Sequence, residues 1–242
     1  MIIKNIPTTR LNKFIAEHSS VSRRKADELI ASDMVFVNGK LVNSLGTKID
    51  PQNDKVTIKG IKLETGFQAT YLALNKPQNY ICTKEDELGR KTIMDLLPQI
   101  ANLKPVGRLD KDTEGLILIS NDGDFINKQT HPKYNKEKEY YVELNGNIKI
   151  EDIKKLERGI ELEEKKTSPA KIKLLEKDNS TSYLTITIHE GINRQIKKMF
   201  MKLGFTVNYL KRIRIGKIFL GNLKTGEYRP LNKFEIYDIK HP

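Results

Sequence analysis

The stretch "GRLDKDTEGLILIS", residues 107–120, limits the possible folds of this chain more than any other part of the sequence. Its aliphatic run, residues 116–119, is too short for a helix and lies between a glycine and the turn-forming residues "NDGD". It therefore predicts a buried strand. An arginine and three acidic residues come directly before that strand. Because loops held by a rigid sheet often carry the chemistry of a protein, this junction is the first candidate for a functional site.

An α+β fold around a mainly antiparallel sheet is predicted for residues 70–242. Further strands, rich in β-branched and aromatic residues, are expected in "TYLALNKP" (70–77), "KPVGRLD" (104–110), "KEYYVELNG" (138–146) and "SYLTITIHEG" (182–191). Helices are expected in "TIMDLLPQI" (92–100), stopped by Pro98, in "IEDIKKLERG" (150–159) and in "NRQIKKMFMKLGF" (193–205). Few strand–helix–strand units alternate, which favours antiparallel pairing.

Residues 1–62 predict a small domain of two helices and a sheet. In "RLNKFIAEH" (10–18) the apolar residues recur with helical spacing, and a serine can cap a second helix in which Ala26 and Ile30 face inward. "MVFVNGKLV" (34–42) is typical of a hairpin with an Asn-Gly turn, and "DKVTIKG" (54–60) adds a strand. Residues 63–69 have no strong periodicity and are expected to link this domain to the catalytic domain, residues 70–242.

The charge of the chain indicates a polyanionic partner. Lys and Arg number 43 against 31 Asp and Glu, a formal net charge of +12, which favours nucleic acid. Arg23 and Arg24 begin the second helix, where a phosphate would offset the unfavourable helix dipole. From Ile192 to Gly226 there are nine Lys or Arg and no acid, which predicts a continuous basic face. A solvated basic surface explains the first cluster equally well, whereas the second is too one-sided in charge for a neutral surface.

The sequence predicts neither a metal site nor a membrane segment. Cys82 is the only cysteine and the four histidines are scattered, so no metal-ligand spacing is present. The N-terminus "MIIKNIPTTR" has no long apolar core, and no window has the roughly 18 apolar residues of a membrane span. We therefore expect a cytoplasmic protein.

Four interpretations compete for the acidic loop. The spacing of Asp110, Asp112 and Glu114 imitates half of a calcium-binding loop, but Asn121 stands where a bidentate glutamate is needed. The residues can simply form a turn. A glycosidase would use a pair of these carboxylates, although it needs no such basic charge. Finally, one carboxylate beside a cation can act on a sugar carbon, and in a basic protein that sugar is expected to be a nucleoside.

The chain resembles the RsuA-like family of bacterial ribosomal RNA pseudouridine synthases. Four motifs occur in the family's order: "LNKP" (74–77), "VGRLDKDTEGLILISNDGDF" (106–125), "KEYYV" (138–142) and "EGINRQIKKMF" (190–200). The front segment, "RLNKFIAEHSSVSRRKADELI" followed by "VFVNGK", resembles the ribosomal protein S-four type of RNA-binding domain. The resemblance implies isomerisation of uridine to pseudouridine without cofactor or metal. It leans towards large-subunit 23S rRNA as substrate and towards a monomer.

The resemblance also assigns catalytic residues. Asp110 would be the catalytic carboxylate, and it would either attack the ribose C1′ or assist proton removal from C2′. Tyr140 would pack against the flipped base, although the neighbouring Tyr141 competes for this role and strand alternation lets only one of them face the site. Lys197 would pair with Asp110 and keep it ionised. Arg194 would serve RNA binding or stacking rather than chemistry.

The expected RNA contacts fall in both domains. In the front domain they are Arg10, Lys13, Arg23, Arg24 and Lys40, and in the catalytic domain Arg108, Arg194, Lys198, Lys211, Arg212 and Arg214. A rival hypothesis is a non-catalytic RNA-binding protein of ribosome assembly with the same fold, which predicts the same basic surface but no turnover. A third is a nucleoside hydrolase, which would release free uracil.

Overall fold

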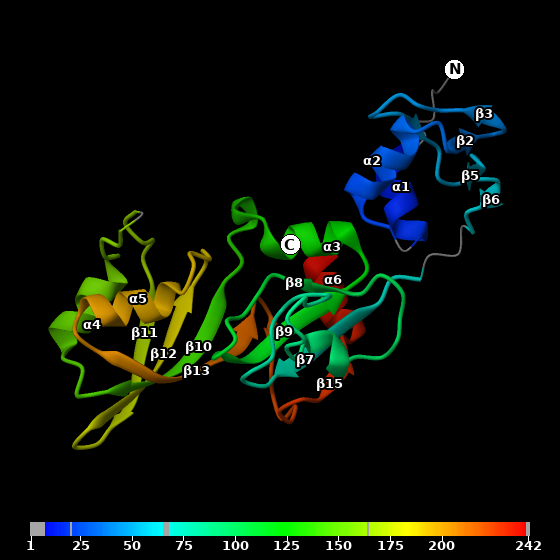
Figure 1. Ribbon diagram of the computed structural model, residues 1–242. Helices are drawn as coiled ribbons and strands as arrows, with labels where there is room; N and C mark the ends of the chain where they lie inside the picture. The colour runs from blue at the N-terminus through cyan, green and yellow to red at the C-terminus, as the bar shows by residue number, and fades with distance from the viewer. Residues whose placement is uncertain (1–7, 20, 65–67, 164, 241–242) are drawn as a thin grey trace. The chain divides into compact units, whose positions relative to one another are not determined.

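The computed structural model describes residues 8–19, 21–64, 68–163 and 165–240, which form two compact units (Figure 1). The chain divides between Ala69 and Thr70, and the short segment Ile100–Asn102 groups with the first unit. The linker predicted at residues 63–69 includes residues 65–67, which lie outside the described residues. Within the described ranges, no helix has the length and apolar character needed to cross a bilayer.

The first unit is built on two packed helices. Helix α1 (Leu11–His18) and helix α2 (Arg23–Ala31) bury their apolar stripes against each other, with Phe14 and Ile30 almost fully buried. The Ser22 side chain caps α2 by accepting a hydrogen bond of 3.1 Å from the Lys25 backbone N–H. The second helix therefore begins where the serine cap predicts it.

A small antiparallel sheet completes the first unit. Its strand order is β3-β2-β5-β6, with bounds β2 (Val35–Val37), β3 (Lys40–Leu41), β5 (Val56–Ile58) and β6 (Ile61–Lys62), and β1 (Thr9–Arg10) pairs separately with β4 (Lys48–Ile49). Asn38 and Gly39 both have positive φ, 50° and 77°, as a two-residue hairpin turn requires. The predicted arrangement of two helices and a sheet is confirmed.

The second unit contains a nine-stranded sheet. The order along the sheet is β11-β12-β10-β13-β9-β7-β15, with β14 paired to β13 and β8 paired to β9. The bounds are β7 (Tyr71–Lys76), β8 (Lys104–Val106), β9 (Glu114–Ser120), β10 (Lys138–Asn145), β11 (Lys171–Lys177), β12 (Thr181–Ile188), β13 (Thr206–Ile215), β14 (Ile218–Phe219) and β15 (Tyr228–Pro230). Among the described strands of this sheet, all pairs are antiparallel except β13 with β9, which confirms the predicted fold class.

Both faces of the sheet are covered at β9, which explains the aliphatic run. Ile117 and Ile119 pack into the core that includes α4 (Ile150–Glu157) and α5 (Gln195–Lys202), which lie over the strands in Figure 1. Leu116 and Leu118 pack on the other face with Phe125 of α3 (Gly123–Thr130) and Ile236 of α6 (Lys233–Lys240). The short 3₁₀ helices are η1 (Ile93–Leu96) and η2 (Pro132–Tyr134).

Helix α3 was not expected from the sequence, where "NDGD" served only to mark the end of the preceding strand. Asp122 within that stretch accepts hydrogen bonds from the backbone N–H groups of Asp124 and Phe125, at 2.9 and 3.1 Å, and so caps the helix. The turn that follows β9 therefore also contains the residue that caps α3.

Gly115 lets β9 and β13 approach each other at the only parallel pairing of the sheet among the described strands. It lies opposite Arg212, and a methyl group there would lie 2.6 Å from the Arg212 nitrogen and closer still to its carbonyl oxygen. Its φ of +110° also excludes ordinary side chains. Glycine at this position brings Arg212 beside the acidic loop.

Candidate active site

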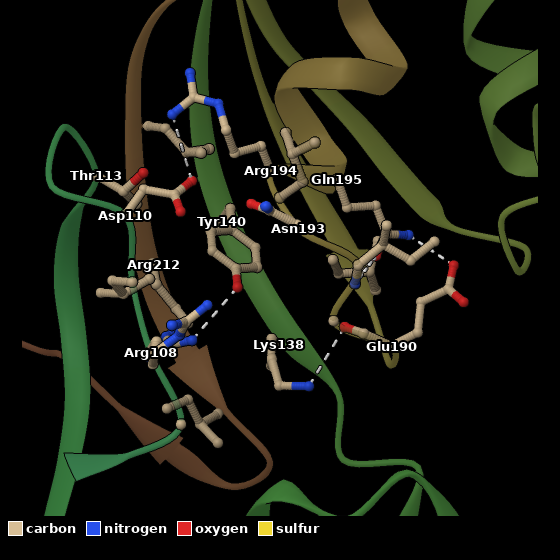
Figure 2. A pocket seen from close by; sticks show the side chains of 18 of the residues that line it. Arg108, Asp110, Thr113, Lys138, Tyr140, Glu190, Asn193, Arg194, Gln195 and Arg212 are labelled. Carbon is tan, nitrogen blue, oxygen red and sulfur yellow. Dashed lines mark hydrogen bonds and ion pairs between the residues drawn. The ribbon is translucent and has the colours of Figure 1, made fainter. Parts of the chain in front are cut away.

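A pocket of about 320 Å³ lies where the acidic loop meets β10, β13 and the segment before α5. Asp110 and Arg108 come from the loop between β8 and β9, Tyr140 from β10, Arg212 from β13 and Arg194 from the segment before α5. Figure 2 shows Asp110 and Arg194 at one end of this pocket and Arg108, Arg212 and Lys138 at the other, with the Tyr140 ring between them. We call the first end the mouth and the second end the floor.

The loop that carries Asp110 is held by a buried lysine. The Lys76 side chain is 0% exposed, and its ammonium donates hydrogen bonds of 2.8 Å to the carbonyl oxygens of Pro77 and Thr113, with a longer one of 3.4 Å to Lys111. The Thr113 N–H closes the turn on the Asp110 carbonyl oxygen at 3.1 Å. These contacts fix the backbone from which Asp110 projects.

Lys76 supports the loop that carries Asp110, and the sequence motifs assigned it no role. Burial lowers the pKa of its ammonium, while the acidic groups of the loop raise it in part. The signal was present in the sequence, because a lysine ends the strand "TYLALNK", in which every residue from Tyr71 to Lys76 is buried. A charge in such a position requires partners, and here they are carbonyl oxygens.

The ion pairs at the mouth correct one expectation. The resemblance pairs Lys197 with Asp110, but the Lys197 ammonium contacts Asp112 at 2.6 Å. The Arg194 guanidinium lies between the carboxylates, 3.5 Å from Asp112 and 3.9 Å from Asp110. The reason is the tight turn from Asp110 to Thr113, which turns both carboxylates towards the start of α5 and leaves the more exposed Asp112 within reach of Lys197.

The cations keep Asp112 ionised. Partial burial raises the pKa of its carboxyl, but the hydrogen bond and charge of Lys197, together with the charge of Arg194, outweigh burial and lower the pKa below its usual value. Arg194, which was expected to serve RNA binding or stacking only, therefore also belongs to the charge arrangement around the two carboxylates.

Arg194 reaches the mouth because its backbone is left-handed. It precedes α5 with φ 52° and ψ 32°, a conformation that a residue other than glycine adopts only when its surroundings impose it. Glu190 supplies that constraint, since it accepts hydrogen bonds from the Gln195 amide at 2.6 Å and from the Ser168 N–H at 2.8 Å. The Gln195 oxygen in turn accepts from the Ile192 N–H at 3.2 Å.

The structure separates the two candidate tyrosines. Tyr140 lines the pocket and is 8% exposed. Tyr141 lies on the opposite face of β10, where its ring is 6.1 Å from that of Tyr209. Strand alternation thus leaves Tyr140 as the tyrosine that a base in the pocket would contact.

Besides the exposed Arg108, the floor of the pocket contains Arg212, which is buried, and Lys138, which is half-buried. Arg212 is 3% exposed and donates from Nε to the Leu116 carbonyl oxygen at 2.7 Å and from Nη1 to the Tyr140 hydroxyl at 3.4 Å. Lys138 donates to the Glu190 carbonyl oxygen at 3.4 Å. Burial and the nearby charge of Arg212 lower the pKa of Lys138 to about 8, against a smaller opposite effect of Glu190.

The basic face predicted from Ile192 to Gly226 is interrupted by carboxylates from other strands. Lys211 pairs with Glu114 at 2.8 Å, and Arg214 pairs with Glu139 at 2.7 Å and Glu137 at 3.2 Å. The segment itself has no acid, but β9, β10 and the residue before β10 supply them across the sheet. Lys211 and Arg214 are therefore neutralised within the fold, and the expectation of a continuous basic face was wrong.

The other expected RNA contacts are not brought into the pocket, with the exception of Arg108, which lines it. Lys198 is half-buried on α5. In the first unit, Arg10, Arg23, Arg24 and Lys40 are exposed, while Lys13 is half-buried and lies 3.8 Å from Glu17. Across the described residues, no three His, Cys, Asp or Glu side chains come together as a metal site would require.

Comparison with known proteins identifies the family. A model of the RNA pseudouridylate synthase family matches residues 70–202, and the S4 domain matches residues 9–56. The ribosomal large subunit pseudouridine synthase B of Bacillus subtilis is 45% identical over 234 residues, which cover 96% of this chain and 95% of that protein. This protein belongs to the RNA pseudouridine synthases. The resemblance to the RsuA-like family is thereby confirmed, and the rival without catalysis is disfavoured.

Two further relatives match over nearly the same length. An uncharacterised RNA pseudouridine synthase of Aquifex aeolicus is 39% identical and covers 95% of this chain and 93% of its own. A crystal structure of a pseudouridylate synthase superposes with a TM-score of 0.69 at 35% identity, covering 95% of this chain and 99% of the other. The similarity to these two relatives therefore extends over both units of the chain.

Proposed function

We propose that this synthase isomerises a uridine of large-subunit ribosomal RNA, with Asp110 as its catalytic carboxylate. The observation that carries the proposal is the position of Asp110 at the mouth of a pocket that also contains a buried tyrosine and cationic side chains. The large-subunit substrate is supported by the name of the Bacillus subtilis relative. The S4 domain, with exposed Arg10, Arg23, Arg24 and Lys40, would hold the surrounding RNA.

The proposed reaction needs the target nucleotide outside its stack, because the glycosidic bond is inaccessible within a helix. The base would enter the pocket along Tyr140, and the ribose would stay at the mouth beside Asp110. The bond between C1′ and N1 breaks with its electron pair on N1, the freed uracil rotates, and a bond forms between C1′ and C5. C5 then loses its proton and N1 gains one, so that the product is an isomer of the substrate. The chain supplies a carboxylate, aromatic packing and fixed charges for these steps.

The ion pairs at the mouth assign supporting roles. Lys197 would hold Asp112, and Arg194 would bridge the two carboxylates so that Asp110 keeps its orientation. A monomer in the cytoplasm is also part of the proposal. Sedimentation of the protein alone and with RNA would test the monomer.

The test of the proposed function is tritium release from ribosomal RNA labelled at uracil C5. Wild-type protein should release tritium from 23S rRNA and not from 16S rRNA, and Asp110→Asn should bind the RNA but release none. Turnover by Asp110→Asn at the wild-type rate would refute the role of Asp110. Release from 16S rRNA alone would refute the large-subunit substrate.

A further inference from the structure

The floor of the pocket holds a buried guanidinium without a counter-ion. Among the described residues, the side-chain Nη2 of Arg212 is buried and has no hydrogen-bond partner, and the remaining contacts of the guanidinium are a carbonyl oxygen and a phenol. Arg212 is only 3% exposed, so a counter-ion would be expected, but no ion pair among the described residues includes it. A buried charge without a partner costs several kcal/mol, so the position indicates that an acceptor joins it in the working complex.

A second cation adds to the excess of positive charge at the floor of the pocket. The Lys138 ammonium lines the same pocket, and its hydrogen bond to the Glu190 carbonyl oxygen is long. Arg212 disfavours the charged form of Lys138, whereas the Glu190 charge offsets this only in part. The mouth differs, because there Arg194 and Lys197 face Asp112. The excess positive charge is thus placed at the floor, together with the exposed Arg108.

The reaction supplies an anion of the right kind at this place. When the bond between C1′ and N1 breaks, the electron pair leaves with N1 and spreads over the ring onto the two carbonyl oxygens of uracil. Asp110 and Arg212 lie at opposite ends of the Tyr140 ring (Figure 2), so a base that entered along Tyr140 with its ribose beside Asp110 would direct an oxygen towards Arg212. The phosphates are attached to the ribose and stay near the mouth, so they reach the floor less easily than the base does.

We propose that Arg212 and Lys138 stabilise the uracil anion that forms when the glycosidic bond breaks, with the unpartnered Nη2–H of Arg212 donating to a uracil oxygen. The inference rests on the proposed function and deepens it, since it gives the pocket floor a role in bond breaking. Arg212 is held for this role by its bond to the Leu116 carbonyl oxygen and by the close approach of Gly115. Donors that are fixed before the charge develops need little rearrangement during the reaction.

The primary test variant is Lys138→Met, because Lys138 is only half-buried and its loss threatens the fold less than the loss of Arg212. The single-turnover rate at saturating 23S rRNA should fall about 10²- to 10³-fold, as for the loss of a donor to a developing anion. The Kd for RNA and its salt dependence should stay unchanged. Lys138→Arg should recover most of the rate, and Lys173→Met, which removes an exposed lysine on β11, should match wild type.

A second arm tests the leaving group directly. In RNA whose target is 5-fluorouridine, the fluorine itself stabilises the uracil anion, so the deficit of Lys138→Met in 5-fluorouridine consumption should shrink. Arg212→Gln, checked for folding by circular dichroism, should show the same pattern. An equal deficit with both substrates would overturn the proposal.

Two other outcomes would also overturn it. A weaker Kd, a salt slope reduced by about 0.7 to 0.9 and an unchanged rate at saturation would show that Lys138 contacts a phosphate. A wild-type rate in Lys138→Met would remove Lys138 from the reaction, while turnover by the wild-type protein would leave the proposed function standing. No turnover by the wild-type protein on any ribosomal RNA would instead refute the proposed function.

Discussion

Asp110 and Asp112 stand two residues apart and have different neighbours. Lys197 and Arg194 both contact Asp112, and Arg194 also lies 3.9 Å from Asp110. Arg194 is therefore shared, and its position depends on how well Lys197 neutralises Asp112. A substitution that changes the ion pairs of Asp112 is therefore expected to change the contact between Arg194 and Asp110 as well.

A double-mutant cycle tests this coupling. Lys197→Met should leave Asp112 with Arg194 as its remaining cation, draw Arg194 away from Asp110 and slow turnover roughly tenfold, a loss of about 1.4 kcal/mol in transition-state stabilisation. Adding Asp112→Asn should release Arg194 and restore part of the rate. The measurement is the single-turnover rate of the two single variants and the double variant. If the double variant is as slow as the product of the two single effects predicts, Arg194 is not shared.

The pH dependence of turnover should report Lys138. Burial lowers the pKa of Lys138 most; of the charged groups that face it, Arg212 on β13 lowers the pKa further and Glu190 before α5 raises it in part, which leaves the pKa at about 8. Lys138 is protonated below this pKa and neutral above it, so the charge needed at the floor is present at low pH and disappears as pH rises through about 8. We expect kcat/KM, which reports the free enzyme, to fall above pH 8.

Lys138→Arg is the matched control for this profile. Arginine stays charged throughout the accessible range, so the alkaline fall in kcat/KM should move to higher pH or vanish. An alkaline limb that is identical in wild type and Lys138→Arg would assign the titration to another group.

The site residues differ in how far the sequence could locate them. The family resemblance assigned Asp110 and Tyr140, strand alternation left Tyr141 as the competing tyrosine, and the structure brings Asp110 and Tyr140 to the pocket. The partners of Lys197, Lys211 and Arg214 could not be derived, because each depends on which acid a distant strand or a turn presents. The local sequence shows that a side chain is charged, but it does not show which opposite charge the fold places beside it.

At the scale of elements, the contact between β9 and β13 joins the acidic loop to the floor of the pocket. It is parallel and short, pairing Lys211 with Glu114 and Arg212 with Gly115. Antiparallel hairpins around it could be expected from turn residues and alternating patterns. This pairing could not, because residues 121–205 separate its two strands and neither strand signals its partner.

Gly115→Ala should break this contact. The added methyl group would overlap the Arg212 backbone, and the φ of +110° disfavours any side chain. We expect a decrease of about 2–3 kcal/mol in the free energy of unfolding, at the upper end of single substitutions, together with a fall in turnover because Arg212 moves. Urea denaturation and single-turnover kinetics measure the two effects.

Gly216→Ala provides the comparison for that experiment. Gly216 also has a positive φ, 55°, but nothing lies within 4 Å of a methyl group there. Its substitution should cost only about 1–2 kcal/mol of backbone strain and leave turnover intact. Equal decreases in the two variants would show that φ, rather than the close approach of β13, decides the cost at Gly115.

At the scale of the whole molecule, the formal net charge of +12 has to be divided between two units that match separate families. In the synthase unit, Lys211 and Arg214 form ion pairs within the fold, and further basic side chains line the pocket. These charges are therefore not part of an open basic surface. In the S4 unit Arg23 and Arg24 stay exposed at the start of α2. Affinity for RNA and catalysis of bond breaking should therefore respond to substitutions in different units.

The double variant Arg23→Gln with Arg24→Gln tests this division. Removing both charges should weaken RNA binding and reduce the slope of log K against log salt by about 0.7 to 0.9 for each phosphate that the protein no longer neutralises. The rate at saturating RNA should stay at the wild-type value, since neither residue belongs to the pocket. The control is Lys171→Gln with Lys173→Gln, an equal change in net charge on exposed positions of β11. If both double variants reduce the slope equally, net charge alone governs binding, and the S4 unit does not bind a specific phosphate at α2.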